Sequence, residues 1–221
     1  MTTLNVDHVY ILVHPVHEKD RFTYLQQHIT SKLPSSQYTY ITPFWKGKDN
    51  AMLITKNINP NKPVRQRLTE GAGFLLLTYY KIMSLFLKSD ADVVLVLESD
   101  VQIHENWIEE CNASIADWKK IDGWKQSMVF CGNGCNLQAP STAKRQGRLV
   151  LMNSSKCTDS MLWSKENIRQ IFKDMFPIIA PIDWFFNYWF ADHPTHQAYW
   201  LEPTIFEQGS QNGTYSSEVQ Y

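Results

Sequence analysis

One stretch of the sequence constrains the fold more than any other. It is a run of branched apolar residues, Val93–Leu97, that ends in Glu98, Ser99 and Asp100. Five such residues with acidic residues on both sides predict a strand that is buried on both faces, as at the centre of a parallel sheet. Because ligands of open α/β sheets sit beyond the carboxyl ends of such strands, we expect a binding site at these three polar residues.

The two carboxylates at this point, Glu98 and Asp100, are two positions apart. In an extended chain they point to the same side and could share a divalent cation. Hard oxygen ligands suit Mn²⁺ or Mg²⁺, and neither ion needs a cage built entirely from protein when phosphate oxygens complete its shell. The alternative is that the acids only begin a turn, as polar residues after strands often do.

The remainder of the chain alternates between strand-like and helix-like patterns. Further strands are expected at residues 7–14, 37–43, 127–131, 148–153, 157–163 and 197–201. Helices are expected at residues 18–32, roughly 72–89, 106–118, 165–175 and 182–191. Residues 44–63 and 132–148 carry many Gly, Asn and Pro, and are interpreted as loops, the first with one helical turn and the second mobile and beside the site. This order predicts an α/β fold, a single Rossmann-like domain with a mostly parallel central sheet flanked by helices.

Charge and hydropathy limit the partners. The 221-residue chain has a formal net charge of −1, which gives no broad attraction to nucleic acid or to anionic membranes. Residues 1–7 are polar, the apolar run 9–13 is too short for a signal peptide, and no segment reaches the ~18 apolar residues that span a bilayer. We therefore expect a cytoplasmic protein, or one domain of a longer chain. The domain is expected to cover residues 1–210, with a polar, disordered tail at 211–221.

The four cysteines, at positions 111, 131, 135 and 157, are too few and too scattered for a disulfide framework. Cys131 and Cys135 flank Gly-Asn-Gly and could bind a metal, but no second ligand pair stands at zinc spacing. We interpret this pair as reduced thiols beside a tight turn.

Asp183 is a third candidate acid. It lies between Ile182 and Trp184, near the start of an otherwise hydrophobic helix. Its simplest role is to stabilise the positive N-terminus of that helix. Its functional role would be a general base that takes a proton from an acceptor hydroxyl, while Trp184 offers a stacking face.

The loop after the first strand contains His14 and His17. In this architecture a nucleotide base commonly docks at such a loop, because it lies at the carboxyl end of a strand. The alternative is that both histidines are turn and helix-start residues.

Other catalytic motifs are missing from the sequence. Gly71-Ala72-Gly73 lacks the Lys-Ser/Thr pair that grips phosphate in a P-loop, which argues against a kinase or NTPase. The sequence also contains no nucleophile elbow.

Several of these segments recur, in the same order, in a known family. They are an Arg21-containing helix start after the first strand, a helix from Gly71 leading to Glu98-Ser99-Asp100-Val101, a small-residue strand from Thr158 to Ser164, Pro181-Ile182-Asp183, and Pro203 followed by Gln208 and Ser210. In this order the chain resembles the glycosyltransferase family 25 group, the lipooligosaccharide and collagen galactosyltransferase type, which has the GT-A fold.

The resemblance implies a nucleotide-sugar donor, a UDP-hexose, and transfer to a hydroxyl of a glycan or glycoprotein. It implies Mn²⁺ (or Mg²⁺) held by Asp100 with the help of Glu98, and an acceptor activated by Asp183. The residues implied to border the donor are Val13, His14, Pro15, Glu98, Ser99, Gln208 and Ser210.

The chain departs from the family pattern at two places. Ser99 replaces the middle Asp of an acidic triplet, and Leu77-Thr78-Tyr79 stands where the family has Ser-His. These departures indicate a divergent or viral-type relative, or another GT-A family with the same layout. One alternative is a sugar-nucleotide nucleotidyltransferase, but such enzymes carry a Gly-rich loop after the first strand, and residues 14–19 do not contain one. The other alternative is a non-catalytic carbohydrate-binding module, which would need no metal.

Overall fold

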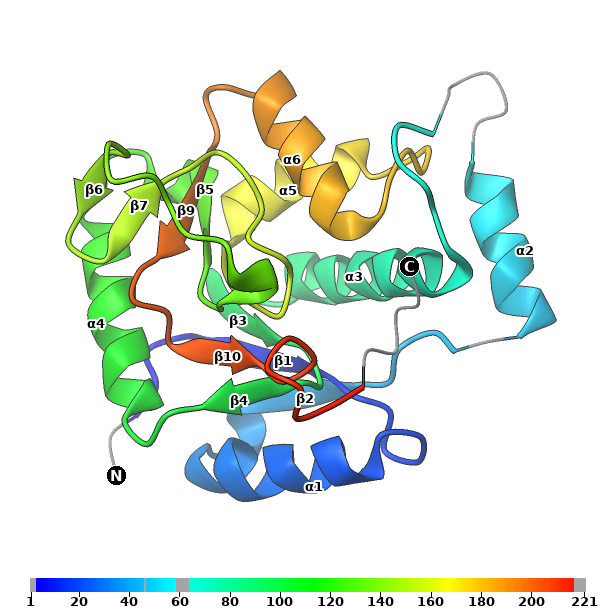
Figure 1. Ribbon diagram of the computed structural model, residues 1–221, viewed down its shortest axis with the longest axis horizontal. Coiled ribbons are helices and arrows are strands. Elements are labelled where there is room, and N and C mark those ends of the chain that lie inside the picture. Colours follow the sequence, from blue (N-terminus) through cyan, green and yellow to red (C-terminus); the bar gives the residue numbers. More distant parts are fainter. Residues whose placement is uncertain (1–2, 46, 59–63, 217–221) are drawn as a thin grey trace.

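A computed structural model of the chain describes residues 3–45, 47–58 and 64–216. Across these residues the main sheet has eight strands in the order β2-β1-β3-β8-β5-β9-β7-β6 (Figure 1). Their bounds are β1 His8–Leu12, β2 Tyr38–Ile41, β3 Val93–Leu97, β5 Ser127–Phe130, β6 Arg145–Gln146, β7 Leu149–Leu151, β8 Ser160–Ser164 and β9 Gln197–Leu201. Six of the eight strands in this described part run the same way and only β7 and β8 are reversed, so the predicted α/β fold with a mostly parallel central sheet is confirmed.

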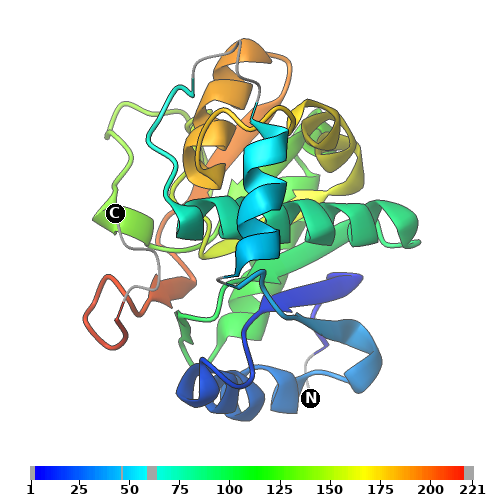
Figure 2. The same cartoon turned by 90° about the vertical axis from the view of Figure 1, so that its right-hand side faces the viewer.

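The helices form a layer on each face of the sheet (Figures 1 and 2). One layer contains α1 (Lys19–His28) and α4 (Trp107–Lys119). The other layer contains α2 (Lys48–Asn57), α3 (Glu70–Lys88), α5 (Lys165–Asp174) and α6 (Ile182–Asp192). Short 3-10 turns span Thr30–Lys32, Ser35–Gln37, Trp124–Gln126 and Gly134–Asn136.

Strand β3 is buried along its whole length, as its sequence predicts. Alternate side chains point to opposite faces of a strand, and Val94 and Val96 accordingly join the core under α3 while Leu95 and Leu97 join the core under α1 and α4. One neighbour, β1, is parallel and the other, β8, is antiparallel. The strand is therefore central, in a sheet of mixed direction.

The chain reverses its order across the sheet between β1 and β3. From β1 it passes through α1 on one face to β2, and from β2 it returns through α2 and α3 on the other face to β3. The two crossovers diverge above the carboxyl ends of β1 and β3. Ligands of open α/β sheets bind in the crevice that such a switch point leaves.

Two of the predicted loops contain regular structure. The interpretation of residues 44–63 as loop with one helical turn is wrong, because α2 has ten residues. Ile54 of this helix is buried against Gly73 of α3, and this packing supports the helix. The residues that suggested a loop, Gly47 and Asn57, stand at its two ends and not in its middle. Residues 59–63 of this segment lie outside the described residues. In the 132–148 segment, β6 pairs with β7.

A small second sheet was not predicted. It pairs β4 (Val101–Ile103) with β10 (Phe206–Gln208), antiparallel. Three residues are too few for a two-residue period to show in the sequence. This pairing places the C-terminal segment directly beside Asp100, whose carbonyl accepts a hydrogen bond from Gly209 N at 2.7 Å.

The packed chain continues beyond residue 210, where the predicted tail starts. Tyr215 N donates to the Gly209 carbonyl at 3.0 Å, and Arg21 Nη2 donates to the Ser216 carbonyl at 2.5 Å. Residues 217–221 lie outside the described part of the chain. Among the described residues, no helix has the length and apolar character needed to cross a membrane.

Candidate functional site

A cavity of about 440 Å³ opens at the switch point between β1 and β3. Leu12 at the end of β1 and the residues that follow β3 form its floor, and α1, α3, α6 and the C-terminal segment contribute its walls. The predicted site residues that line it are Glu98, Ser99, Asp100, Asp183, Gln208 and Ser210. The fold thus brings together carboxylates that are far apart in the sequence.

Glu98 is held by two hydroxyl groups. Its Oε1 accepts from Thr158 Oγ1 at 2.6 Å, and the Tyr79 hydroxyl lies 2.8 Å from the same oxygen and 2.7 Å from the Thr158 carbonyl. Burial, and secondly the charge of Asp100, raises the pKa of Glu98 to about 7. The side chain can therefore be either neutral or charged near neutral pH.

Asp100 is 5% exposed, and its two oxygens have different surroundings. Oδ2 accepts from Ser210 Oγ at 2.5 Å. Oδ1 is buried and has no hydrogen-bond partner among the described residues. A buried carboxylate oxygen without a partner is costly, so this atom is a natural ligand for a cation.

Glycine is required where the C-terminal segment meets this corner. A Cβ at Gly209 would come within 2.6 Å of the Tyr215 ring and 2.9 Å of the Asp100 carbonyl oxygen. The absence of a side chain lets the two backbones approach, and this approach places Ser210 against the Asp100 carboxylate.

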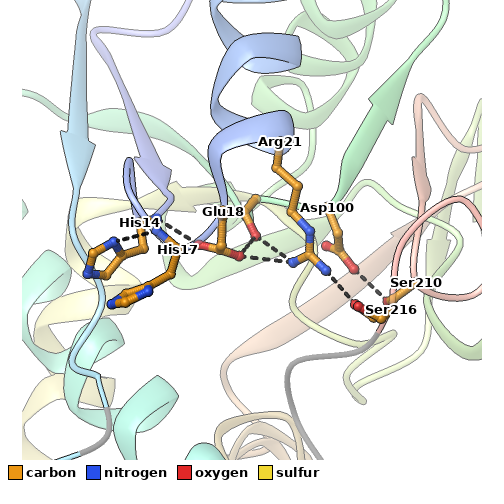
Figure 3. Close-up of polar contacts among 8 residues, drawn as sticks. His14, His17, Glu18, Arg21, Asp100, Ser210 and Ser216 are labelled. Atoms are coloured by element: carbon orange, nitrogen blue, oxygen red, sulfur yellow. Dashed lines mark hydrogen bonds and ion pairs between the residues drawn. The ribbon is translucent and has the colours of Figure 1, made fainter.

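A buried ion pair stands beside Asp100 (Figure 3). Arg21 Nη1 donates to Glu18 Oε1 and to Ser99 Oγ, both at 2.9 Å. The Ser99 hydroxyl also donates to Glu18 Oε1. The Arg21 guanidinium lies 5.0 Å from the centre of the Tyr215 ring. Ser99 therefore forms hydrogen bonds with both residues of the ion pair. The family that this chain resembles has an acid at this position.

Asp159 is a further acid that the sequence did not reveal as a site residue. It is 1% exposed, and its Oδ1 has no partner within the described residues. Burial, and secondly the charge of Glu98, raises the pKa of Asp159 well above its usual range. A Cβ at Gly132 would overlap its Oδ2, so Gly132 leaves the space that Asp159 fills. Asp159 lies behind the cavity wall, next to Thr158.

Asp183 faces the cavity from the first turn of α6. Burial raises the pKa of Asp183, an effect that the backbone N–H groups of Trp184 and Asp183 partly offset. Trp184 lines the cavity next to it and is 40% exposed. The accessible Trp184 ring can stack on a sugar, and the Asp183 carboxylate beside it can take a proton from a hydroxyl of that sugar.

The remaining walls are aromatic and cationic. Phe44 and Trp45, which follow β2, line the cavity, as does the exposed Arg67 before α3. Aromatic faces accept bases and sugar rings, and an arginine binds phosphate oxygens in a bidentate manner.

Three predicted donor-binding residues do not line the cavity. Val13 is fully buried, and Pro15 is exposed in the turn after β1. His14 organises this turn, since its ring Nδ1 accepts from the backbone N–H groups of Val16 and His17 at 3.3 and 3.2 Å. Both histidine rings contact Trp45, the His17 ring stacked on it at 4.7 Å between centroids. The contact of residues 13–15 with a nucleotide stays a prediction.

The carboxylates of the cavity are possible ligands for Mn²⁺ or Mg²⁺. Among the described residues, no group of three or more His, Cys, Asp and Glu side chains is arranged to hold a metal ion. These ions, however, bind through one or two carboxylates when substrate phosphates supply the other ligands. The unpartnered Asp100 Oδ1, with Glu98 in the same cavity wall, fits that mode of binding.

Sequence reasoning missed the groups that hold the acids in place. Tyr79 and Thr158 were expected only as members of a helix and a strand, yet both contact Glu98. A signal existed for Tyr79, because it stands at the place of the Ser-His in the resembling family. Glu18 stands three residues before Arg21, a spacing that allows an ion pair on a helix, but its contact with Ser99 is made only by the fold.

Comparisons with known proteins identify no family for this chain. No protein-family model matches the sequence, and no curated protein matches it. A similar solved structure is that of a mannose-1-phosphate geranyltransferase from Thermus thermophilus. The identity is 9% and the TM-score is 0.45, over 88% of this chain and 73% of that chain. A similarity at this level says nothing about the reaction.

Proposed function

We propose that the protein is a metal-dependent glycosyltransferase of the GT-A type. It transfers a hexose from a UDP-sugar to a hydroxyl of a glycan or glycoprotein acceptor. The observation that supports this most is the Asp100 carboxylate, which has a buried oxygen without a partner and shares one cavity with Glu98 and Asp183. The family resemblance assigns the same three acids.

In this proposal Asp100 holds Mn²⁺ or Mg²⁺ with the assistance of Glu98. The bound ion supplies positive charge that offsets the charge developing on the nucleoside diphosphate leaving group. Ser210 keeps the Asp100 carboxylate in position through its hydrogen bond to Oδ2. Arg67, at the cavity edge, provides a second positive charge for the phosphates.

Asp183 accepts the proton of the acceptor hydroxyl. The raised pKa of Asp183 makes it a stronger base than an exposed carboxylate, and Trp184 stacks against the sugar ring that carries the hydroxyl. The nucleotide lies toward Trp45 and the turn of residues 13–15, and Gln208 and Ser210 close the site from the C-terminal side. Catalysis is then mainly positioning and charge stabilisation, since the diphosphate is a good leaving group.

The test is calorimetry of UDP binding with and without Mn²⁺. We expect Mn²⁺ to increase UDP affinity, and Asp100→Asn to reduce that Mn²⁺-dependent affinity by roughly 100-fold. The control is Asp92→Asn, which changes an exposed carboxylate at the opposite end of β3. If UDP binds equally well to wild type and Asp100→Asn in the presence of Mn²⁺, the metal assignment is wrong.

A hydrolysis screen of UDP- and GDP-sugars with Mn²⁺ separates the alternatives. A glycosyltransferase hydrolyses its donor slowly to the nucleoside diphosphate and free sugar. A nucleotidyltransferase instead forms a sugar nucleotide from a sugar phosphate and a nucleoside triphosphate. A carbohydrate-binding module binds sugar without metal and turns over neither substrate, and that result would overturn the proposal.

A further inference from the structure

Two cysteines that are distant in the sequence meet at the wall of the cavity. Cys135 lies in the Gly134–Asn136 turn after β5, and Cys157 lies just before β8. Their Sγ atoms are 2.7 Å apart, about 0.7 Å more than the ~2.05 Å of a disulfide bond. Cys157 lines the cavity and Cys135 is exposed. The neighbour of Cys135 in the fold is therefore Cys157 and not Cys131, which is fully buried in the core.

The backbone at both cysteines is unusual. Cys135 has φ 55° and Cys157 has φ 61°, in the left-handed region that residues other than Gly, Asn and Asp rarely adopt. The two turns are also packed tightly, because a Cβ at Gly134 would come within 2.3 Å of the Cys157 Cβ. Strained backbone of this kind persists where surrounding structure over-determines it, and it is concentrated at functional sites.

We propose that Cys135 and Cys157 are a reversible redox pair. A low-molecular-weight disulfide such as oxidised glutathione converts their two thiols to an internal disulfide bond, and reduced glutathione restores the thiols. The proposal rests on the distance between the sulfurs, on the two left-handed turns that face each other, and on the exposure of Cys135. It goes beyond the proposed transferase activity and does not depend on it.

The exchange occurs in two steps. The Cys135 thiolate attacks one sulfur of oxidised glutathione, the glutathione disulfide bond breaks, and one glutathione leaves as thiolate. The Cys157 thiol then loses its proton and attacks Cys135 Sγ, the mixed disulfide breaks, and the second glutathione leaves. The two protein thiols are oxidised by two electrons, glutathione disulfide is reduced to two thiols, and the two cysteine protons pass to the leaving glutathiones.

Cys135 is the attacking residue. The hydrogen bond with Cys157 lowers the pKa of Cys135 to about 7, whereas the same contact raises the pKa of Cys157. The exposed thiol is thus also the one that ionises near neutral pH. Cys111 and Cys131 are buried, and burial raises the pKa of each, so both serve as unreactive internal controls.

The disulfide would join two arms of the site. Next to Cys157, Thr158 donates to Glu98, and near Cys135, Asn133 Oδ1 accepts from Gln208 N at 2.8 Å. Oxidation would therefore fix the Glu98 wall relative to the C-terminal segment.

The experiment incubates the reduced protein in glutathione buffers of increasing oxidised fraction and stops the exchange with acid. The free thiols are then alkylated in denaturant near neutral pH, where buried thiols also react. We expect mass spectrometry to show loss of two hydrogens, a peptide link between Cys135 and Cys157, and Cys111 and Cys131 alkylated. Return to reduced glutathione should restore both thiols.

Two variants test the order of attack. Cys157→Ser should stop at a single glutathione adduct on Cys135. Cys135→Ser should accumulate adduct on Cys157 at least about tenfold more slowly, because Cys157 is half-buried and burial by itself raises the pKa of its thiol. Circular dichroism shows whether each variant is folded. The proposal is overturned if wild type gains stable glutathione adducts without an internal link, or if both thiols stay reduced while a cysteine-containing reference peptide is fully oxidised in the same buffer.

Discussion

The cavity has two walls of different character. On the wall formed by the end of β3, α1 and the C-terminal segment, each charged group has partners within the protein: Arg21 with Glu18, Asp100 with Ser210, and Glu98 with Thr158. On the wall formed by α6 and residues 43–45, the surface is largely aromatic. Asp183 is the one acid that lines the cavity on that wall within the described residues.

The difference shows how one cavity can serve two tasks. Groups that must hold charge in a fixed place are oriented by hydrogen bonds formed before any ligand arrives, so little reorganisation is needed on binding. A wall that receives rings can be apolar, since stacking needs area rather than direction. We therefore expect substitutions on the polar wall to affect stability and metal-dependent binding, and substitutions on the aromatic wall to affect turnover and ring recognition.

The largest effect is expected on the aromatic wall, at its single acid. Asp183→Asn should lower kcat by roughly 10² to 10⁴, because a positioned base contributes about that much, while UDP affinity with Mn²⁺ stays unchanged. The measurement is transfer from the donor found in the hydrolysis screen, together with calorimetry. Asp192→Asn, at the exposed C-terminal end of the same helix, is the matched control. A normal kcat in Asp183→Asn would mean that the base lies elsewhere.

The next effect tests the buried ion pair of the polar wall. Arg21→Met leaves the Glu18 carboxylate buried without its charge partner, and the free energy of unfolding should fall by about 3–5 kcal/mol. Lys120→Met breaks the exposed pair with Asp117 and should cost only about 0–1 kcal/mol. Urea unfolding measures both. Equal losses in the two variants would show that the polar wall is no more rigid than the surface.

A third effect concerns the pH dependence of stability in the metal-free protein. Burial raises the pKa of Glu98 to about 7 from an unfolded value near 4.5, so the folded state holds this proton over a range where the unfolded chain has lost it. The contribution of Glu98 to stability is full below pH 4.5 and is lost as pH rises through 7, a change of ~3 kcal/mol.

Glu98→Gln should therefore flatten the fall in stability between pH 4.5 and 7. Urea unfolding at several pH values measures the slope, and Glu70→Gln, an exposed carboxylate of α3, should keep the wild-type profile. If the slopes of wild type and Glu98→Gln coincide, Glu98 is not the group that holds the proton.

The sequence predicted the elements that carry the acids better than the contacts that hold them. Five consecutive branched apolar residues define β3, and the carboxyl-end rule for α/β sheets then places Glu98 and Asp100 at a site. Asp159 lay beyond such reasoning, because its burial depends on Gly132, which belongs to a different strand connection. Partnerships between residues far apart in the sequence leave no local pattern.

The two cysteine turns illustrate the same limit. Spacing along the chain drew attention to Cys131 and Cys135, four residues apart, whereas the fold brings Cys135 into contact with Cys157. In the same way, α2 was missed because Gly47 and Asn57 suggested a loop, although they stand at the two ends of the helix. Breaker residues mark boundaries, and only packing decides what lies between them.

The smallest effect distinguishes the two tryptophans of the aromatic wall, Trp45 and Trp184. Trp45→Ala should weaken UDP binding by about 1–3 kcal/mol if the base stacks there, in the range of base–aromatic stacking. Trp184→Ala should leave UDP affinity unchanged and weaken only the acceptor, since Trp184 adjoins Asp183 rather than the turn after β1. Calorimetry with UDP and Mn²⁺ on both variants makes the comparison. Should Trp184→Ala be the one that loses UDP affinity, the nucleotide lies on the α6 side, and Asp183 then faces the donor instead of the acceptor.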